Sequence, residues 1–407
     1  MRLKYYFLLL LCVSCSHPKQ PAITDASQLE PFTEGSFVYY PIKDNRVPVD
    51  LNNPQKGSLF DYFEHIELIP LETNDDVLMG KAYMVTFYLN SYYFFDVQQQ
   101  IVYVFDDAGK FVSKIAKRGQ GPGEYGRIED LTINPFTGTI NLLEPFGRLH
   151  IYDLSGNHIK SVRVTDDEVL AVHYLRALNE NTYVFLSMFH SSKILYYDIE
   201  EMKILHQEYE ECPFAARFNK AMNPFYEYHG KWYFYRYFDR ETYEIGQDSL
   251  IKAYSWDFGE HNYDIGKMFF PETTFRDVNT LVDEARRFPY RIRIQGQNNK
   301  YVMAQICLKN EARANLLDRS APDNEVYANL MYDKSTQECK FIEHFIELVE
   351  FRPYMVTNEY ILNFCNHGEL EKYVTREMLD ETSRQKFDDL MNTKEEENQI
   401  IIKYYLR

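Results

Sequence analysis

A short pattern recurs along the chain, in which an apolar or aromatic strand ends at an aspartate and is followed by a turn and a second strand. The first three copies end at Asp106, Asp153 and Asp198, at intervals of 47 and 45 residues (106 to 153 and 153 to 198). An aspartate at this position can accept hydrogen bonds from the turn backbone, which is typical of a β-hairpin. Repetition at a fixed period indicates a chain built from similar supersecondary units.

Each interval also contains two earlier strands. Between Asp106 and Asp153 we expect strands over 131–133 and 139–143, separated by a turn that contains proline and glycine. Between Asp153 and Asp198 we expect them over 169–178 and 182–187. Four strands in about 45 residues is the size of one β-propeller blade, so the sequence predicts an all-β propeller.

Later copies are longer. Asp257 and Asp333 end further strands after 59 and 76 residues (198 to 257 and 257 to 333). Apolar residues with helical spacing from Phe275 to Ala285 predict a helix inserted in the longer interval. A second inserted helix is predicted over about Arg376 to Met391.

The last repeat lacks a strand of its own. It would contain strands at 355–356, 360–364 and 400–406, and the segment 65–71 could supply the fourth strand. That pairing would join the two ends of the chain in one blade and close the ring, which protects the sheet edges. We therefore predict a six-bladed β-propeller over 61–407 with two short helical insertions.

The N-terminus has the features of a secretory signal. Arg2 and Lys4 precede an apolar segment from Tyr5 to Val13, which is shorter than the about 20 residues that span a bilayer. Cys15 after the small Ser14 resembles a bacterial lipoprotein signal over 1–15, in which the cysteine becomes lipidated. Cleavage by an ordinary signal peptidase is the alternative, because Cys12 stands where leucine is usual.

Residues 16–60 read as a tether and lead-in segment. We expect a lipid-anchored protein of the cell envelope, held at the outer membrane by its N-terminal lipid. No acidic residue immediately follows Cys15, which favours the periplasmic side.

The formal net charge of −17 argues against nucleic acid as a partner, because such a chain cannot neutralise phosphates over a broad face. Four cysteines lie beyond the signal, at Cys212, Cys307, Cys339 and Cys365. Their spacing contains no C-x-x-C motif, so a zinc site is not predicted. One or two disulfides are allowed in an exported protein, and the sequence leaves their pairing open.

A glycine-rich run precedes the strand at 131–133. It contains Arg118, Gly119, Gly121, Pro122, Gly123, Glu124 and Tyr125. Its glycines suit a connector that crosses from the outer edge of one blade to the inside of the next. The alternative is a ligand loop that lines the top of the central channel through its backbone N–H groups and Arg118 or Glu124.

The glycine-proline run, the hairpins that end in aspartate and the Asn398–Tyr404 segment together resemble the six-bladed β-propeller lipoproteins of Gram-negative bacteria. These are relatives of NHL-repeat propellers, whose loop pattern is similar to Gly119–Tyr125 and whose third strand is similar to Arg148–Asp153. The resemblance implies a propeller fold and an envelope location. NHL propellers are mostly interaction platforms and in a minority metal-dependent enzymes, so the fold does not select the function.

The segment from Phe225 to Tyr243 is dense in aromatic rings. Strand alternation places Trp232 on one face and Tyr233, Tyr235 and Tyr237 on the other. These rings suit packing between blades, and the alternative is an aromatic surface that stacks against a sugar or a peptide.

Only a few charged residues and histidines are candidates for a binding site. Arg291 and Arg293 alternate onto one strand face and could clamp an anion, or could be locally ion-paired. Asp130 and Glu144 lie near inner strands, where a channel carboxylate would sit. The histidines are scattered without a metal-binding motif.

We therefore predict a binding or protein-interaction module for an oligosaccharide, a peptide or an envelope protein, with no catalytic residue, metal ligand or cofactor assigned. The first alternative is a metal-dependent envelope lyase or hydrolase with its site on the propeller axis. The second is a scaffold for a neighbouring membrane complex.

Overall fold

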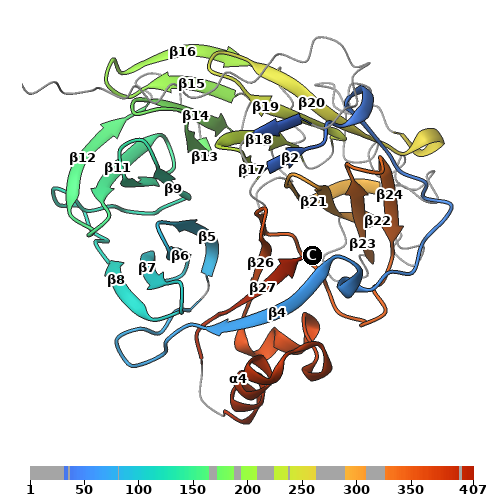
Figure 1. Ribbon diagram of the computed structural model, residues 1–407. Helices are drawn as coiled ribbons and strands as arrows, with labels where there is room; N and C mark the ends of the chain where they lie inside the picture. Colours follow the sequence, from blue (N-terminus) through green and yellow to red (C-terminus); the bar gives the residue numbers. More distant parts are fainter. Residues whose placement is uncertain are drawn as a thin grey trace, which may run out of the picture.

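Six β-sheets are arranged as the blades of a propeller around a central axis (Figure 1). The computed structural model describes residues 32–34, 37–80, 82–164, 172–187, 194–208, 224–236, 239–262, 289–308, 326–393 and 397–407. Within these residues the predicted all-β, six-bladed fold is confirmed.

Blades 1 to 5 follow one another along the chain, and each runs from an inner strand to an outer one. Blade 1 consists of β5 (Ala82–Tyr88), β6 (Ser91–Asp96), β7 (Ile101–Asp106) and β8 (Phe111–Ile115). Blade 2 consists of β9 (Asp130–Asn134), β10 (Thr139–Leu143), β11 (Arg148–Asp153) and β12 (His158–Arg163). Blade 3 consists of β13 (Val172–Ala177), β14 (Thr182–Ser187), β15 (Ile194–Asp198) and β16 (Lys203–Glu208).

Blade 4 is the largest sheet. It consists of β17 (Phe225–Tyr228), β18 (Lys231–Tyr235), β19 (Glu241–Ile245) and β20 (Leu250–Asp257), with β3 (Arg46–Pro48) added in parallel on its outer edge. Blade 5 consists of β21 (Pro289–Gln297), β22 (Tyr301–Leu308), β23 (Val326–Asp333) and β24 (Glu338–Ile342).

Blade 6 closes the ring. It consists of β25 (Met355–Val356), β26 (Tyr360–Cys365), β27 (Ile400–Leu406) and, as its outer strand, β4 (Phe63–Pro70) from the start of the chain. The antiparallel register pairs Ile402 with Leu68. The predicted closure is therefore confirmed, and buried side chains of blades 1 and 6 pack together in one cluster.

The core is divided among the spaces between neighbouring blades. The buried apolar side chains of the described residues form six clusters, and each cluster combines side chains from two adjacent blades. Both faces of the middle strands are therefore buried, which explains why every residue of β10 and β22 is buried.

The repeated aspartates have the predicted turn role. Asp106 Oδ1 accepts hydrogen bonds from the N–H groups of Ala108 and Lys110, and Asp198 Oδ1 does so from Glu200 and Glu201. One position needs correction, because Asp257 ends the fourth strand of its blade and not the third. The third strand, β19, ends at Ile245 without an aspartate.

The second predicted helix is present with a later start. A 3-10 turn, η6, spans Arg376–Met378, and helix α4 spans Glu381–Asn392. The helix begins there because the Asp380 side chain accepts the Ser383 N–H and caps it. The helix predicted from Phe275 to Ala285 lies outside the described residues.

Part of the predicted lead-in segment packs against the propeller. A small hairpin joins β1 (Phe32–Glu34) to β2 (Phe37–Tyr39). The 3-10 turn η1 (Lys43–Asn45) precedes β3, and Val49 and Leu51 are buried against blades 4 and 5. The 3-10 turn η2 (Leu59–Asp61) then leads into β4. Residues 1–15, with the predicted lipidation site Cys15, lie outside the described residues.

Two further 3-10 turns, η4 (Gly259–His261) and η5 (His367–Lys372), follow blade strands. No helix in the described ranges is long and apolar enough to cross a bilayer. Cys307, Cys339 and Cys365 are present as thiols, and Cys212 lies outside the described residues.

Candidate functional site

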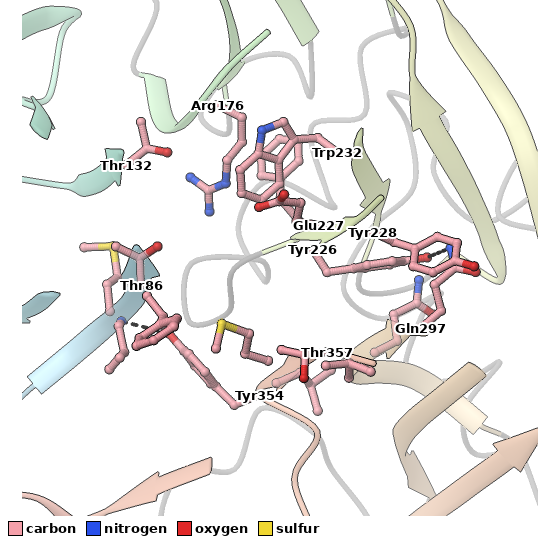
Figure 2. Close-up of a pocket in the computed structure, with 18 of the residues that line it drawn as sticks. Thr86, Thr132, Arg176, Tyr226, Glu227, Tyr228, Trp232, Gln297, Tyr354 and Thr357 are labelled. Carbon is pink, nitrogen blue, oxygen red and sulfur yellow. Dashed lines mark hydrogen bonds between the residues drawn. The ribbon is translucent and has the colours of Figure 1, made fainter. Parts of the chain in front are cut away.

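A cavity of about 540 Å³ lies on the propeller axis. The first strands of all six blades contribute to its wall. The lining residues include Thr86, Thr132, Arg176, Glu227, Gln297 and, directly after β25, Thr357 (Figure 2). Its volume lies within the range of about 300–1,000 Å³ that is usual for small-ligand sites. We call it the axial cavity.

A buried ion pair joins two blades at the wall of the axial cavity. Arg176 Nη1 on β13 lies 2.8 Å from Asp130 Oδ2 on β9, and the Leu175 N–H also donates to Asp130 Oδ2 at 2.8 Å. Asp130 is fully buried and Arg176 is 3% exposed. Burial raises the pKa of Asp130 above its ordinary value, although Arg176 and the Leu175 N–H act to lower it.

Arg176 is held in place but keeps unused donor capacity. Its guanidinium lies 5.1 Å from the Phe225 ring centroid and 5.0 Å from that of Trp232. Among the described residues its Nε is buried without a hydrogen-bond partner. Asp130 Oδ1 likewise forms no well-aligned hydrogen bond there, although the Leu131 N–H acts to lower the carboxyl pKa.

Glu227 on β17 is the second carboxylate of the cavity wall. Figure 2 shows it near Arg176 and Trp232. Glu227 is exposed by its accessible surface because it faces the cavity, but the protein atoms packed around it desolvate the carboxylate. This desolvation raises the pKa of Glu227 above its ordinary value, with Arg176 acting in the opposite direction.

Aromatic rings and amides complete the wall. Tyr226 stacks on Tyr233, and its hydroxyl accepts a hydrogen bond of 3.1 Å from Gln297 Nε2. On the opposite side the Val85 N–H donates to the Tyr354 hydroxyl at 3.1 Å (Figure 2). The axial cavity thus offers ring surface together with fixed hydrogen-bonding groups, the usual composition of a ligand site.

The aromatic strand predicted from sequence is divided between this cavity and the blade interfaces. Trp232 and Tyr235 line the cavity. Tyr233 lies on the same strand face as Tyr235 and is buried with it between blades 4 and 5, but it does not reach the cavity wall. The strand therefore presents no open aromatic surface within its described part, and Tyr237 lies outside the described residues.

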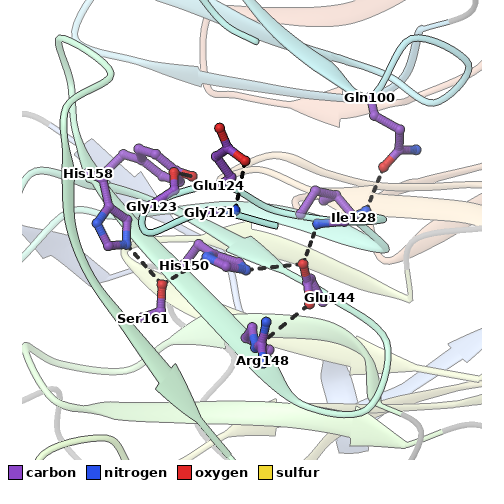
Figure 3. Close-up of polar contacts among 12 residues, drawn as sticks. Gln100, Gly121, Gly123, Glu124, Ile128, Glu144, Arg148, His150, His158 and Ser161 are labelled. Atoms are coloured by element: carbon purple, nitrogen blue, oxygen red, sulfur yellow. Dashed lines mark hydrogen bonds and ion pairs between the residues drawn. The ribbon is translucent and has the colours of Figure 1, made fainter. Parts of the chain in front are cut away.

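The glycine-rich run is a connector between β8 and β9. Tyr125 is fully buried, and its hydroxyl donates to the carbonyls of Gln100 and Ile115 at 2.8 and 2.9 Å. Glu124 Oε2 accepts the Gly121 N–H at 2.8 Å, and Gly123 has a φ of +75° with its carbonyl bound to the Tyr152 hydroxyl (Figure 3).

None of the seven predicted loop residues, Arg118, Gly119, Gly121, Pro122, Gly123, Glu124 and Tyr125, lines the axial cavity. The run is therefore a connector that does not line this cavity, and contact of the loop with a ligand stays a prediction. The run leads from the outermost strand of blade 1 to the innermost strand of blade 2, and only its far end, at Asp130, reaches the cavity wall.

A second polar cluster lies beside this loop in blade 2 (Figure 3). Ser161 Oγ lies 2.9 Å from both His150 Nδ1 and His158 Nε2. His150 Nε2 lies 3.2 Å from Glu144 Oε1, which also accepts the Gly126 N–H at 2.5 Å. We call these four residues, Glu144, His150, His158 and Ser161, the rim cluster.

The rim cluster has shifted pKa values of its own. Burial acts to raise the pKa of Glu144, but hydrogen bonds from His150 and the Gly126 N–H outweigh it and hold the pKa below its ordinary value. Burial also lowers the pKa of His158, with further lowering from His150 and Lys117. Glu144 is therefore not the channel carboxylate that its position suggested, whereas Asp130 is.

Arg293 lines the axial cavity, with its Nη1 bound to Gln305 Oε1 at 3.0 Å and its guanidinium 4.0 Å from the Tyr327 ring centroid. An amide and a ring therefore engage Arg293 in place of the predicted ion pair, and the Arg291 side chain lies outside the described part of the structure. Among the described residues no group of three or more His, Cys, Asp or Glu side chains is placed to hold a metal ion.

Sequence reasoning missed Arg176 and Glu227. The signal for Arg176 was an arginine inside a mostly apolar strand, where a buried charge requires a partner. Glu227 was hidden in the ring-dense segment, where it is the acid of β17. Neither strand reveals that the two side chains approach each other.

A family model matches residues 44–405, almost the whole described chain. The chain belongs to the family described as Domain of unknown function (DUF4934). The match covers all six blades, so the DUF4934 domain is the propeller itself together with β3. No curated protein matches the sequence.

Solved structures share the fold of this DUF4934 protein. A Bacteroides fragilis protein described as exported is 14% identical, with a TM-score of 0.66 over 89% of this chain and 99% of its own. A member of the DUF4221 family from Bacteroides vulgatus is 10% identical, with a TM-score of 0.51 over 84% of this chain and 96% of its own. At these identities the likeness shows the fold alone.

Proposed function

We propose that this DUF4934 protein is a binding module of the cell envelope whose ligand, an oligosaccharide or a peptide, enters the axial cavity. The observation that carries the proposal is the cavity wall itself. It combines aromatic rings with charged side chains, Arg176 and Glu227, that retain hydrogen-bonding capacity. Buried polar groups without partners are costly, so a ligand that binds them gains affinity.

Tryptophan fluorescence tests this proposal directly. The chain has two tryptophans, of which Trp232 lines the cavity and Trp256 is fully buried between blades 4 and 5. The Trp256→Phe variant therefore leaves Trp232 as the only indole. We expect its emission to shift when the folded body is titrated with a binding member of a panel of oligosaccharides and peptides.

Calorimetry with the same panel gives the affinities. Trp232→Ala should weaken binding roughly tenfold or more, because aromatic side chains in such sites carry much of the affinity. Phe136→Ala is the matched control, since Phe136 is 52% exposed and lies outside the cavity wall. A panel that yields neither heat nor a Trp232 signal would count against the proposal.

The location is part of the same proposal. The signal-like segment that ends at Cys15, the resemblance to envelope lipoproteins and the exported relative of the same fold all support an outer-membrane, periplasm-facing lipoprotein. Mass spectrometry of the mature N-terminus should find a lipid-modified Cys15, and Cys15→Ala should release the protein from the membrane fraction. An unmodified N-terminus at another residue would overturn the lipid anchor and leave the binding proposal standing.

A further inference from the structure

The charged groups of the axial cavity define the kind of ligand it takes. We infer that Asp130, Arg176 and Glu227 form a subsite for a neutral sugar residue, whose adjacent hydroxyls bind the guanidinium and the carboxylates together. The inference rests on the proposed function and selects the sugar over the peptide.

The Arg176 side chain is fixed in position at the cavity wall. Arg176 is held by Asp130, by the Leu175 carbonyl and by the rings of Phe225 and Trp232. Figure 2 shows its guanidinium directed into the cavity between Thr132 and Glu227. A side chain held in this way loses little conformational entropy when a ligand binds, which favours affinity.

Arg176 and Glu227 both have hydrogen-bonding capacity that the described residues do not use. Arg176 can only donate, and its Nε has no partner among the described residues. Glu227 as a carboxylate can only accept, and no hydrogen bond or ion pair to a described residue engages it. A ligand that binds both must therefore present an acceptor and a donor close together.

Positive and negative side chains at and next to the cavity wall balance each other. Three arginines, Arg176, Arg293 and Arg352, and two acids, Asp130 and Glu227, line the cavity, and Arg352 is neutralised by Glu350, which is not a lining residue. A ligand carboxylate near Arg176 would meet Asp130 and Glu227, and a ligand ammonium near Glu227 would meet Arg176. The burial of Asp130 and Arg176 and the desolvation of Glu227 make such like-charge contacts costly.

A vicinal diol, a pair of hydroxyls on adjacent carbons, can bind Arg176 and Glu227 together and adds no charge. Each hydroxyl donates one hydrogen bond and accepts others, so one can accept from Arg176 while its neighbour donates to Glu227, without adding charge. Sugars also present apolar ring faces that suit the tyrosine and tryptophan walls. A peptide backbone offers donors and acceptors too, but its charged ends and side chains are disfavoured by the charge balance.

Calorimetry of the folded body with three probe sets tests the inference. The sets are short neutral oligosaccharides, uronic-acid oligosaccharides of the same length, and peptides of similar mass. We expect binding from the neutral set. Glu227→Gln should weaken it roughly ten- to hundredfold, the loss typical of a hydrogen bond to a charged group.

Glu144→Gln is the matched control, because it makes the same chemical change in the rim cluster, outside the cavity. It should leave the affinity for neutral oligosaccharides unchanged. Glu227 has no bonded partner among the described residues, so its variant is expected to fold, and a thermal melt checks this.

Every other outcome overturns the sugar subsite, the proposed function or both. Binding by peptides or uronic-acid oligosaccharides in place of neutral ones overturns the sugar subsite and leaves the proposed function intact. Neutral binding that Glu227→Gln does not alter also overturns the subsite. Absence of binding from all three sets removes both.

Discussion

Blade 2 takes part in two acid–base clusters that differ in how completely their members are bonded. In the rim cluster, Ser161 bridges two histidines and Glu144 accepts the Gly126 N–H, while His150 Nε2 lies 3.2 Å from Glu144 Oε1 without a well-aligned hydrogen bond. In the axial cavity, Asp130 and Arg176 bind each other but each keeps an atom without a hydrogen bond, and Glu227 has no bonded partner among the described residues.

The origins of the residues differ as well. The rim cluster comes from one blade, within the segment 144–161, whereas the cavity cluster takes one residue from each of blades 2, 3 and 4. The carboxyl pKa values shift in opposite directions, downward at Glu144 and upward at Asp130 and Glu227. Polar groups that satisfy each other stabilise a fold, and groups left open in a cavity indicate a ligand.

The largest expected effect is at the cavity pair. Asp130→Asn leaves Arg176 buried without its counter-charge, so the free energy of unfolding should fall by about 3–5 kcal/mol. Urea denaturation measures the loss. The double variant Asp130→Asn with Arg176→Met should recover part of it, because the unpaired charge is gone. If the double variant is no more stable than Asp130→Asn alone, the charge argument fails.

A smaller effect is expected in the loop beside the rim cluster. Gly123→Ala should lower the free energy of unfolding by about 1–3 kcal/mol, because φ is +75° and an added Cβ would lie 2.9 Å from the His158 ring. Gly138→Ala is the control, since its φ is +61° but the space around it is open. Equal losses in the two variants would show that contact with His158 contributes nothing.

Removal of the bridging hydroxyl should cost less. Ser161→Ala takes away the partner of two ring nitrogens, but Ser161 is exposed and water can replace it, so we expect a loss of about 1 kcal/mol. The affinity for a cavity ligand, measured by calorimetry, should not change. A weakened affinity would mean that the two clusters are coupled and would end the contrast between them.

The smallest expected effect is on how the free energy of unfolding changes in acid. Because the pKa of Glu144 is lower in the folded chain than in the unfolded one, the unfolded chain binds more protons in acid. The stabilisation by Glu144 is therefore complete above its ordinary pKa and is lost as the pH falls through the folded value. We expect Glu144→Gln to cost about 0.5 kcal/mol at neutral pH and nothing in stronger acid. A difference that persists when denaturation is repeated in acid would contradict the assigned direction.

The blade count and the ring closure could be predicted from the sequence, because repeated strands and hairpin aspartates are local signals. The pairing of β27 with β4 followed from the need of the last repeat for a fourth strand, whereas their register came from the structure. The repeat assignment failed at Asp257, where a strand-then-aspartate pattern occurs one strand later than in the other blades. A local pattern identifies a hairpin but does not state its position within the blade.

The candidate site could be predicted only in fragments. Asp130 and Trp232 were recognised as candidates, whereas Arg176 and Glu227 were not. The residues of the glycine-rich loop were also candidates, but they do not line the axial cavity. Cavity residues are separated by one blade or more along the chain. Their approach depends on how the blades pack, which strand periodicity does not encode.

The sequence by itself determined the architecture: repeated four-stranded units, with a closing strand borrowed from the start of the chain. Alternation and turn chemistry act over a few residues, so they can be read directly. Only the tertiary structure decided that Asp130, Arg176 and Glu227 meet on the axis and that the rim cluster is internally bonded. Whether a buried charge has found all its partners depends on three-dimensional neighbours, and that decides between a structural role and a binding role.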